Sequence, residues 1–232
     1  MKYFLITITV LTFGLFVAFP SVDIFVSDLF YIEGKGFIYR YHIISQMLYV
    51  SIRILTGIVL SISFYIVFVD FIKNKNIEVP CAKYLFKIRE FFRFTWQQAI
   101  YLISVILITP GIVVHWIGKP LWDRGRPVNI TEFGGEKQFT PIYEIMAGQN
   151  GNSFPSGHAS MSFAFIALIY LFKENRKLAA LVTITYAILG SLCRVWQGGH
   201  YLSDVSVSAV ITLWTIYLCK IYILENKKLQ NL

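Results

Sequence analysis

The sequence predicts an all-α polytopic membrane protein, a bundle of six transmembrane helices, and three observations support this fold class. The chain of 232 residues is 56% hydrophobic and only 15% charged, whereas an average soluble domain is about 25% charged. Its apolar residues form long runs, as helices that cross a bilayer require. Lysines and arginines concentrate between alternate runs, which is typical of a chain that passes back and forth through a membrane. We expect one membrane domain over residues 1–232.

Six apolar runs are candidate spans. The fourth and the fifth are short for a hydrocarbon core of about 30 Å, so we expect both to extend into their polar flanks. The first run could also be a secretory signal peptide, but Phe19-Pro20-Ser21-Val22 is a poor cleavage site, so we expect the run to be kept as a span. The six runs are Tyr3–Phe19, Ile54–Ile72, Trp96–Ile117, His158–Phe172, Leu178–Leu192 and Val205–Leu224.

The formal net charge of +8 is unevenly placed along the chain, and its placement predicts the orientation. With a cytoplasmic N-terminus, most basic residues fall on the cytoplasmic side, as the positive-inside rule requires. Both termini are then cytoplasmic. The bilayer is the expected partner, because no basic stripe on a soluble domain indicates nucleic acid. The residues expected inside are Lys2, Lys73, Lys75, Lys83, Lys87, Arg89, Arg93, Lys173, Arg176, Lys177, Lys227 and Lys228, and those expected outside are Lys35, Arg40, Lys119, Arg124, Arg126, Lys137 and Arg194.

Three segments between the runs show patterns of their own. Residues 83–94 place apolar side chains on one helical face and charged ones on the other, which predicts a basic amphipathic helix at the cytoplasmic membrane surface. We interpret it as a juxtamembrane anchor rather than a regulatory lipid sensor. Val22–Gln46 mixes aromatic and charged residues and is expected along the interface near the site. Val128–Ser153 is polar and turn-prone, and either recognises a head group or links its neighbours.

Two further sets of polar or reactive side chains carry no functional pattern. Asp70, near the end of the second run, is expected to be solvated or paired with Lys73 or Lys75. The cysteines show neither disulfide nor metal-ligand spacing, so we interpret them as small apolar residues and expect no metal and no cofactor. They are Cys81, Cys193 and Cys219.

The first of three blocks that carry chemistry is Lys119–Pro127, with the sequence KPLWDRGRP. Lys119 and Arg126 are seven residues apart, and Gly125 with Pro127 predicts a helix end that curls into a loop. An arginine can hold a phosphate through two parallel hydrogen bonds, and a lysine binds it as a point charge. Taken alone, the two cations are also typical of side chains that reach for the membrane surface.

The second block, Phe154–His158 (FPSGH), is expected to start the fourth helix. Pro155 suits a first helical turn because it lacks an N–H. The free N–H groups of Ser156, Gly157 and His158 would then form an anion site. Ser156 adds a hydroxyl donor, and His158 is a candidate general acid. Taken alone, the block also fits a simple turn and helix cap.

The third block, Arg194–Asp204 (RVWQGGHYLSD), holds a histidine and a carboxylate. His200 and Asp204 are four residues apart, so we expect them on one face of a helix. A carboxylate on one imidazole nitrogen fixes the tautomer and leaves the other nitrogen free to attack. The pair Gly198-Gly199 is expected to give a phosphate open access, and Arg194 supplies a further cation.

Together the three blocks resemble the membrane branch of the type-2 phosphatidic acid phosphatase superfamily. One residue departs from the family pattern: Cys193 stands where a serine usually precedes the arginine, and we expect it to weaken at most a minor contact with phosphate or backbone. The match lies within about residues 96–224. The pattern K-x6-RP, PSGH and R-x5-H-x3-D is met by Lys119, Arg126-Pro127, Pro155-Ser156-Gly157-His158, Arg194, His200 and Asp204.

The resemblance implies a metal-independent phosphoric monoester hydrolase without a cofactor. His200 would attack phosphorus to form a phosphohistidine, and Asp204 would orient His200. His158 would protonate the leaving oxygen and then activate water. The residues that would hold the phosphate are Lys119, Arg126, Ser156, Gly157 and Arg194.

The expected orientation opens the site on the extracytoplasmic side, which implies a lipid substrate in a bacterial inner membrane and a periplasmic active site. The sequence around the motifs resembles that of lipid A phosphatases, and it resembles the 4′-phosphatases more than the 1-phosphatases. The two stretches are GRPVNITEFGGEKQFTP and RVWQGGHYLSDV. Phosphatidylglycerophosphate and undecaprenyl diphosphate phosphatases share the motifs and stay open as alternatives. A vanadate haloperoxidase is disfavoured by the six spans, and a non-catalytic lipid-binding or transport relative by the two histidines. No obligate protein partner is implied.

Overall fold

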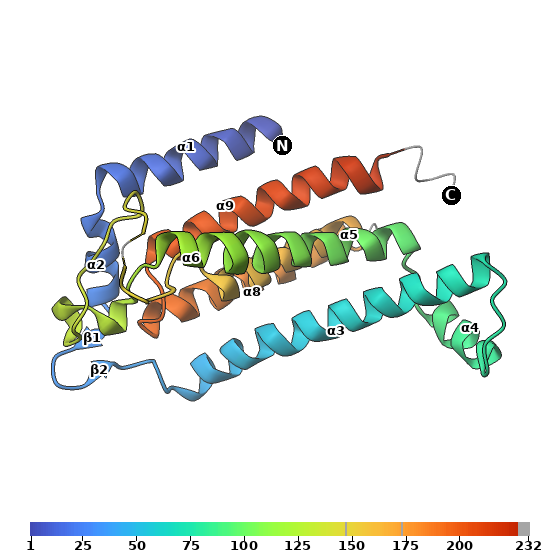
Figure 1. The fold of residues 1–232 in the computed structure, drawn as a ribbon, viewed down its shortest axis with the longest axis horizontal. Helices are drawn as coiled ribbons and strands as arrows, with labels where there is room; N and C mark the ends of the chain where they lie inside the picture. Colours follow the sequence, from blue (N-terminus) through green and yellow to red (C-terminus); the bar gives the residue numbers. More distant parts are fainter. Residues whose placement is uncertain (147, 173, 227–232) are drawn as a thin grey trace.

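The computed structural model describes residues 1–146, 148–172 and 174–226, and these are mostly helical, as the sequence predicts (Figure 1). Lys173, Lys227 and Lys228, expected on the cytoplasmic side, lie outside the described residues. A short antiparallel hairpin pairs β1 (Tyr31–Ile32) with β2 (Gly36–Phe37). The helices are α1 (Lys2–Ala18), α2 (Ser21–Asp28), α3 (Ile43–Asn74), α4 (Ala82–Phe91), α5 (Trp96–Ile106), the π-helical η1 (Leu107–Gly118), α6 (Lys119–Trp122), the 3-10 turns η2 (Pro127–Asn129) and η3 (Thr131–Phe133), α7 (Gly157–Ala164), η4 (Phe165–Tyr170), α8 (Arg176–Trp196), α9 (Leu202–Cys219) and η5 (Lys220–Leu224).

Each of the six predicted runs is helical, but they differ in their capacity to cross a membrane. Four helical stretches are long and apolar enough: Ile43–Asn74, Trp96–Asn129, Arg176–Trp196 and Leu202–Leu224. The pair α1 and α2 passes the same test only as one bent unit, with an angle of 87° between the two helices. The helix formed by α7 and η4 is apolar but shorter. The described residues thus hold four or five candidate spans by length, and the count of six stays a prediction.

The second span starts well before its predicted first residue. Helix α3 begins at Ile43, whereas the apolar run was expected to begin at Ile54. Its first turns contain the polar residues Gln46 and Arg53. Because these residues lower the local hydropathy, the hydropathy pattern does not indicate where the helix starts. These turns therefore bring polar side chains to the end of the bundle where the motif blocks lie.

The spans pack so that all three motif blocks gather at one end of the molecule, while α4 lies at the opposite end (Figure 1). Helix α3 packs against α5, α7 packs against both α8 and α9, and α1 packs against α9. The main apolar core is formed by buried side chains of α5, α7 with η4, and α9. These are Tyr101, Leu102, Val105, Ile106, Ala164, Ala167, Leu171, Ile216 and Cys219.

Two prolines shape the chain near the motif blocks. Pro20 precedes the first turn of α2, a position that tolerates its missing N–H, and the chain bends there by 87°. The bend turns α2 across the end of the bundle and carries Asp23 into the interior, where it is 1% exposed. Pro110 lies within the π-helical stretch η1, where its missing N–H interrupts regular α-helical bonding.

The amphipathic helix predicted before the third span is present as α4, with its residues exposed or half-buried. It is tied to α3 by an ion pair between Arg89 and Asp70. Arg89 Nε lies 2.8 Å from Asp70 Oδ1, and Arg89 Nη2 lies 2.8 Å from Asp70 Oδ2. The expectation that Asp70 pairs with Lys73 or Lys75 is therefore wrong. A guanidinium fork matches a carboxylate with two parallel bonds, which an ammonium group cannot do.

Candidate active site

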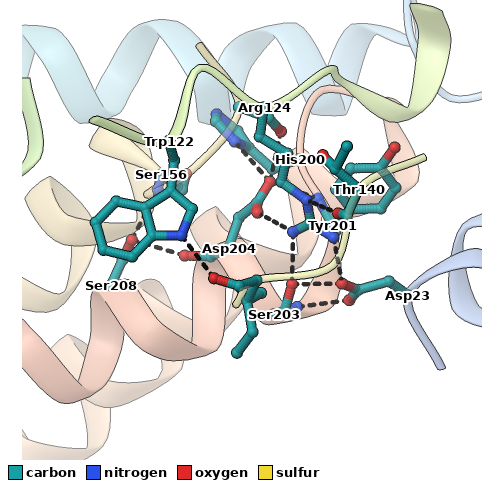
Figure 2. Close-up of polar contacts among 12 residues, drawn as sticks. Asp23, Trp122, Arg124, Thr140, Ser156, His200, Tyr201, Ser203, Asp204 and Ser208 are labelled. Carbon is teal, nitrogen blue, oxygen red and sulfur yellow. Dashed lines mark hydrogen bonds and ion pairs between the residues drawn. The ribbon is translucent and has the colours of Figure 1, made fainter. Parts of the chain in front are cut away.

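A buried ion network joins three distant parts of the chain at the centre of the candidate site (Figure 2). The Arg124 side chain, which is fully buried, lies between Asp23 of α2 and Asp204 of α9. Its Nη2 is 2.9 Å from Asp23 Oδ2, and its Nη1 is 2.6 Å from Asp204 Oδ1. Its Nε donates to the carbonyl oxygen of Thr140 at 2.6 Å. One guanidinium thus connects α2, the loop after the third predicted span, and α9.

Each of the two carboxylates in this network accepts several hydrogen bonds besides its ion pair with Arg124. Asp23 accepts hydrogen bonds from the backbone N–H of Ser203 at 2.8 Å and from its hydroxyl at 2.5 Å. Asp204 Oδ2 accepts from the Ser153 hydroxyl at 2.5 Å and from the backbone N–H of Tyr201 at 2.9 Å. Because buried carboxylates are stable only when they are paired and hydrogen-bonded, these interactions let both remain in the interior.

The loop after the third span closes tightly around Arg124. The centroids of the Tyr201 and Phe139 rings lie 4.1 Å and 5.3 Å from the Cζ atom of Arg124. The Arg124 carbonyl accepts a hydrogen bond from the Ser153 N–H at 2.9 Å. A Cβ atom at Gly151 would lie 2.1 Å from that carbonyl oxygen, so only glycine fits there. The segment expected to recognise a head group or to act as a linker therefore also holds the ion network together.

His200 lies in the turn between α8 and α9 and is 2% exposed. Its Nδ1 is 3.4 Å from Asp204 Oδ2, slightly beyond ordinary hydrogen-bond distance. The two residues do not share a helix face, as their spacing suggested, because α9 begins only at Leu202. Asp204 instead turns back over the start of the helix, where it caps the Tyr201 N–H, and this brings its carboxylate to the imidazole.

The environment of His200 keeps its imidazole neutral. Its pKa is lowered to about 4, chiefly by burial, with the cations Arg194 and Arg126 adding to the effect and Asp204 opposing it. The ring therefore carries no charge at neutral pH. With Nδ1 facing Asp204, the proton is best held on Nδ1, and Nε2 keeps its lone pair.

The second block starts a helix as expected, but one of its three N–H groups is not free. Helix α7 begins at Gly157, and the Ser156 hydroxyl caps it by accepting from the Ala159 N–H at 3.3 Å. The Ser156 N–H itself donates to the Ser208 hydroxyl at 2.8 Å (Figure 2), so it cannot serve an anion. A Cβ atom at Gly157 would lie 2.6 Å from the His115 ring, so the block packs directly on the third span.

The His158 ring stacks on Tyr49 of α3, with ring centroids 4.2 Å apart and an angle of 18° between the planes. The guanidinium carbons of Arg194 and Arg53 lie 4.8 Å and 4.7 Å from the centroid of the same tyrosine. Nε2 of His158 is buried without a hydrogen-bond partner among the described residues. Tyr49 thus holds a histidine and an arginine from two different motif blocks against one ring.

The predicted cations converge on this region. Lys119 interacts electrostatically with Arg126, Arg194 and Asp204, and His158 interacts with Arg194, His200 and Lys119. Arg126 and Arg194 both line a pocket of about 240 Å³. Each has a buried Nε without a hydrogen-bond partner in the described part of the chain. Several positive side chains with unused donors, packed together, form a site for an anion.

Of the two glycines of the third block, Gly199 lines the pocket beside Arg126 and Arg194, whereas Gly198 is not among the pocket residues. Gly198 adopts a φ of +65°, and a Cβ atom there would lie 2.4 Å from the Phe37 ring. A Cβ atom at Gly199 would lie 2.3 Å from Arg194 Nη2. Each glycine therefore makes room for a packed side chain, and the pair fixes the hairpin and the arginine in place.

Cys193, which replaces the serine usual in the family pattern, faces α3. Its Sγ is 3.3 Å from the Ser45 carbonyl oxygen, to which it donates, and its side chain is buried. The contact is with the backbone, one of the two possibilities expected from the sequence.

Three residues of this arrangement were not singled out from the sequence: Asp23, Arg124 and Tyr49. Arg124 lies within the first block but outside its K-x6-RP pattern, and Asp23 follows the first apolar run. A signal existed, since charged residues next to membrane spans are usually paired with each other or functional. Tyr49 lay before the predicted start of its span and had no such signal.

The described residues offer no obvious metal centre. Within residues 1–146, 148–172 and 174–226, no three His, Cys, Asp or Glu side chains are grouped as ligands for one ion. The charged side chains that line the pocket are all arginines, which suit an anionic ligand.

Replacing Arg124 with methionine should destabilise the protein strongly, because two buried carboxylates would lose their shared counter-charge. Removal of one member of a buried ion pair typically costs about 3–5 kcal/mol. We expect a clear fall in the thermal unfolding midpoint in detergent, and a smaller fall for Arg124→Lys, which keeps the charge but loses the fork. The exposed Lys35→Met is the matched control. An Arg124→Met protein as stable as this control would contradict the assigned role.

A sequence profile of the PAP2 superfamily matches residues 98–228, more than half of the chain and the stretch that contains all three motif blocks. The chain is 38% identical over 133 residues to the lipid A 4′-phosphatase of Francisella tularensis subsp. novicida, a match that covers 54% of this chain and 60% of the relative. It is 29% identical over 131 residues to the lipid A 4′-phosphatase of Rhizobium leguminosarum, covering 56% of each. The matches thus span little more than half the length of these relatives.

The fold has a counterpart among solved structures. The crystal structure of the first transmembrane PAP2 type phosphatidylglycerolphosphate phosphatase, from Bacillus subtilis, superposes with a TM-score of 0.52. The two sequences are 18% identical, and the match covers 96% of this chain and 97% of the other. This likeness concerns the arrangement of the helices alone. The profile match, which covers more than half of the chain and all three motif blocks, shows that the chain belongs to the PAP2 superfamily.

Proposed function

We propose that the protein is an integral-membrane phosphatase that hydrolyses a phosphomonoester of a lipid, namely lipid A, through a phosphohistidine intermediate. The observation that carries the proposal is a buried His200 that faces Asp204, in a region where three cations and His158 converge. A neutral imidazole is a nucleophile, and a cluster of cations with unused donors binds a phosphate.

In the first step, the Nε2 lone pair of His200 forms a bond to phosphorus while the ester P–O bond breaks. The proton on Nδ1 stays directed at Asp204, which stabilises the positive charge that develops on the ring. His158 gives a proton to the leaving oxygen, so the lipid departs as an alcohol. Tyr49 keeps the His158 ring in position by stacking on it.

In the second step, water attacks the phosphohistidine. His158, now neutral, takes a proton from the water as the new P–O bond forms and the N–P bond breaks. Inorganic phosphate leaves, and both histidines return to their starting states. Over the two steps, the P–O bond of the ester has been replaced by a P–O bond to the oxygen of water, and the enzyme is unchanged.

Lys119, Arg126 and Arg194 neutralise the phosphate oxygens through both steps, and the Ser156 hydroxyl and the Gly157 N–H add donors at the start of α7. Fixed donors of this kind stabilise the charge of a transition state without reorganising. They fill the part that a metal ion plays in other phosphatases, so we propose a metal-independent reaction.

Two observations support lipid A as the substrate and the periplasmic face of a bacterial inner membrane as the place. The relatives named above are lipid A 4′-phosphatases, and the matches with them extend over 133 and 131 residues. The motif blocks gather at one end of the bundle, where a head group at the membrane surface can reach them (Figure 1). The positive-inside rule assigns this end to the periplasm and both termini to the cytoplasm.

Release of phosphate from defined lipids tests the substrate. Purified protein in detergent with EDTA should release phosphate from lipid A, and the mass of the product should show loss of the 4′-phosphate. Phosphatidylglycerophosphate and undecaprenyl diphosphate serve as the alternative substrates, each in a separate reaction. Faster release from either would replace lipid A as the substrate. Activity that returns only when divalent metal is restored would contradict the metal-independent reaction.

His200→Asn should lower kcat by at least about 10³-fold, because it removes the group that bonds to phosphorus. Reactions with ³²P-labelled substrate, stopped with detergent at alkaline pH, should show a phosphoenzyme in the wild type that is stable to alkali and lost in acid, and none in this variant. His158→Gln should still form the phosphoenzyme from p-nitrophenyl phosphate, whose leaving group needs no proton, and should fail with the lipid. A phosphoenzyme that persists in His200→Asn would overturn the nucleophile assignment.

The imidazole of His200 should stay neutral down to about pH 5, because its pKa in the free enzyme is lowered to about 4 by burial and by neighbouring cations. Its ionised fraction falls as pH rises, so at neutral pH the nucleophilic form predominates. NMR titration of labelled histidines should show no transition of the His200 ring between pH 5.5 and 8, and the loss of its signal in His200→Asn assigns it. A His200 midpoint at pH 6 or above would contradict this prediction.

A further inference from the structure

A pocket of about 240 Å³ adjoins the proposed phosphate site and extends beyond the motif blocks. Its volume corresponds to about eight water molecules of liquid, more than one phosphate group fills. One wall comes from the motif blocks, through Arg126, Arg194 and their neighbours. The other wall comes from the segment before α3 and its first turns, through Arg40, Tyr41, Gln46 and Tyr49. That second wall lies outside the stretch matched by the family profile.

The pocket contains one more cation than the proposed chemistry uses. Arg40 has a buried Nη1 without a hydrogen-bond partner among the described residues, as do the Nε atoms of Arg126 and Arg194. No Asp or Glu is among the described residues that line the pocket. No carboxylate of the described chain lies within ion-pair distance of these three arginines. Three uncompensated guanidinium groups around one cavity repel one another unless an anion joins them.

The position of Arg40 is built into the fold. Its N–H donates to the Phe37 carbonyl at 3.0 Å, and its own carbonyl accepts from Gln46 Nε2 at 2.7 Å. Phe37 in turn packs on Gly198 of the third block. The neighbouring Tyr39 ring lies 6.2 Å from that of Trp196. The backbone of Arg40 is thus anchored both to α3 and to the turn that carries His200.

We propose that Arg40 forms a second anion subsite next to the phosphate site, which holds a further phosphate or carboxylate group of the substrate head group. The inference rests on the proposed function, because it takes Arg126 and Arg194 as ligands of the scissile phosphate. Arg40 then faces a second anionic group of the same head group. The subsite selects lipids with two neighbouring anionic groups over lipids with one, and it acts on binding rather than on the chemical step.

Two inhibitors that differ only in their number of anionic groups test this subsite: inorganic phosphate and methylenediphosphonate, which cannot be hydrolysed. The wild type should bind the diphosphonate at least tenfold more tightly than phosphate. Arg40→Gln should weaken inhibition by the diphosphonate at least tenfold and inhibition by phosphate less than threefold. Lys35→Gln, on the exposed turn of the same hairpin, is the matched control and should change neither. Arg40→Lys should restore part of the difference.

Calorimetric titration of the two anions into the same proteins separates this proposal from the proposed function, because it needs no turnover. If the wild type binds the diphosphonate in an Arg40-dependent way but hydrolyses no lipid, the subsite stands and the proposed function fails. If Arg40→Gln weakens both anions equally, or neither, the subsite is overturned. A second bound phosphate in the wild type that is absent from Arg40→Gln would identify free phosphate, rather than a substrate group, as the occupant.

Discussion

The shared use of Arg124 by Asp23 and Asp204 is the interaction on which the rest of the site depends. Its guanidinium reaches both carboxylates, which come from helices at opposite ends of the sequence. Asp204 can approach His200 only because Arg124, Ser153 and the Tyr201 N–H together offset the burial of its charge. A buried carboxylate without these partners would take up a proton, and the neutral group would no longer orient the imidazole through its charge. The geometry of the proposed nucleophile is therefore set by a residue that never touches phosphate.

The same network explains why the loop after the third span is ordered around the site. Arg124 is held by the Thr140 carbonyl and lies between the Phe139 and Tyr201 rings. Phe133 of this loop packs against Tyr31 and Phe37 of the hairpin, with ring centroids in this cluster 5.1–5.5 Å apart. Apolar packing holds the loop closed. The buried charges fix the position of Arg124 along the loop, because a shifted loop would leave Asp23 and Asp204 without their counter-charge.

Composition and periodicity were enough to predict the helical membrane fold, and motif spacing was enough to predict which residues gather at its end. The hydrophobic runs mark the helices because a bilayer leaves few alternatives to an apolar helix. Local spacing failed where tertiary contacts decide the outcome. His200 and Asp204 meet through a helix cap rather than through a helix face, and Gly198 accommodates Phe37 rather than lining the pocket. Asp70 pairs with a distant arginine, which no pattern within α3 could indicate.

The division of the site between two parts of the chain bears on how far its relatives can inform its specificity. The proposed catalytic residues all lie in the stretch matched by the family profile. Asp23, Arg40 and Tyr49 lie before that stretch, yet they complete the ion network, line the pocket and stack on His158. A chemistry common to the superfamily can thus be preserved by the motif core while the N-terminal segment changes. If specificity for a head group depends on the charges of this segment, similarity in the core alone predicts the reaction better than it predicts the lipid.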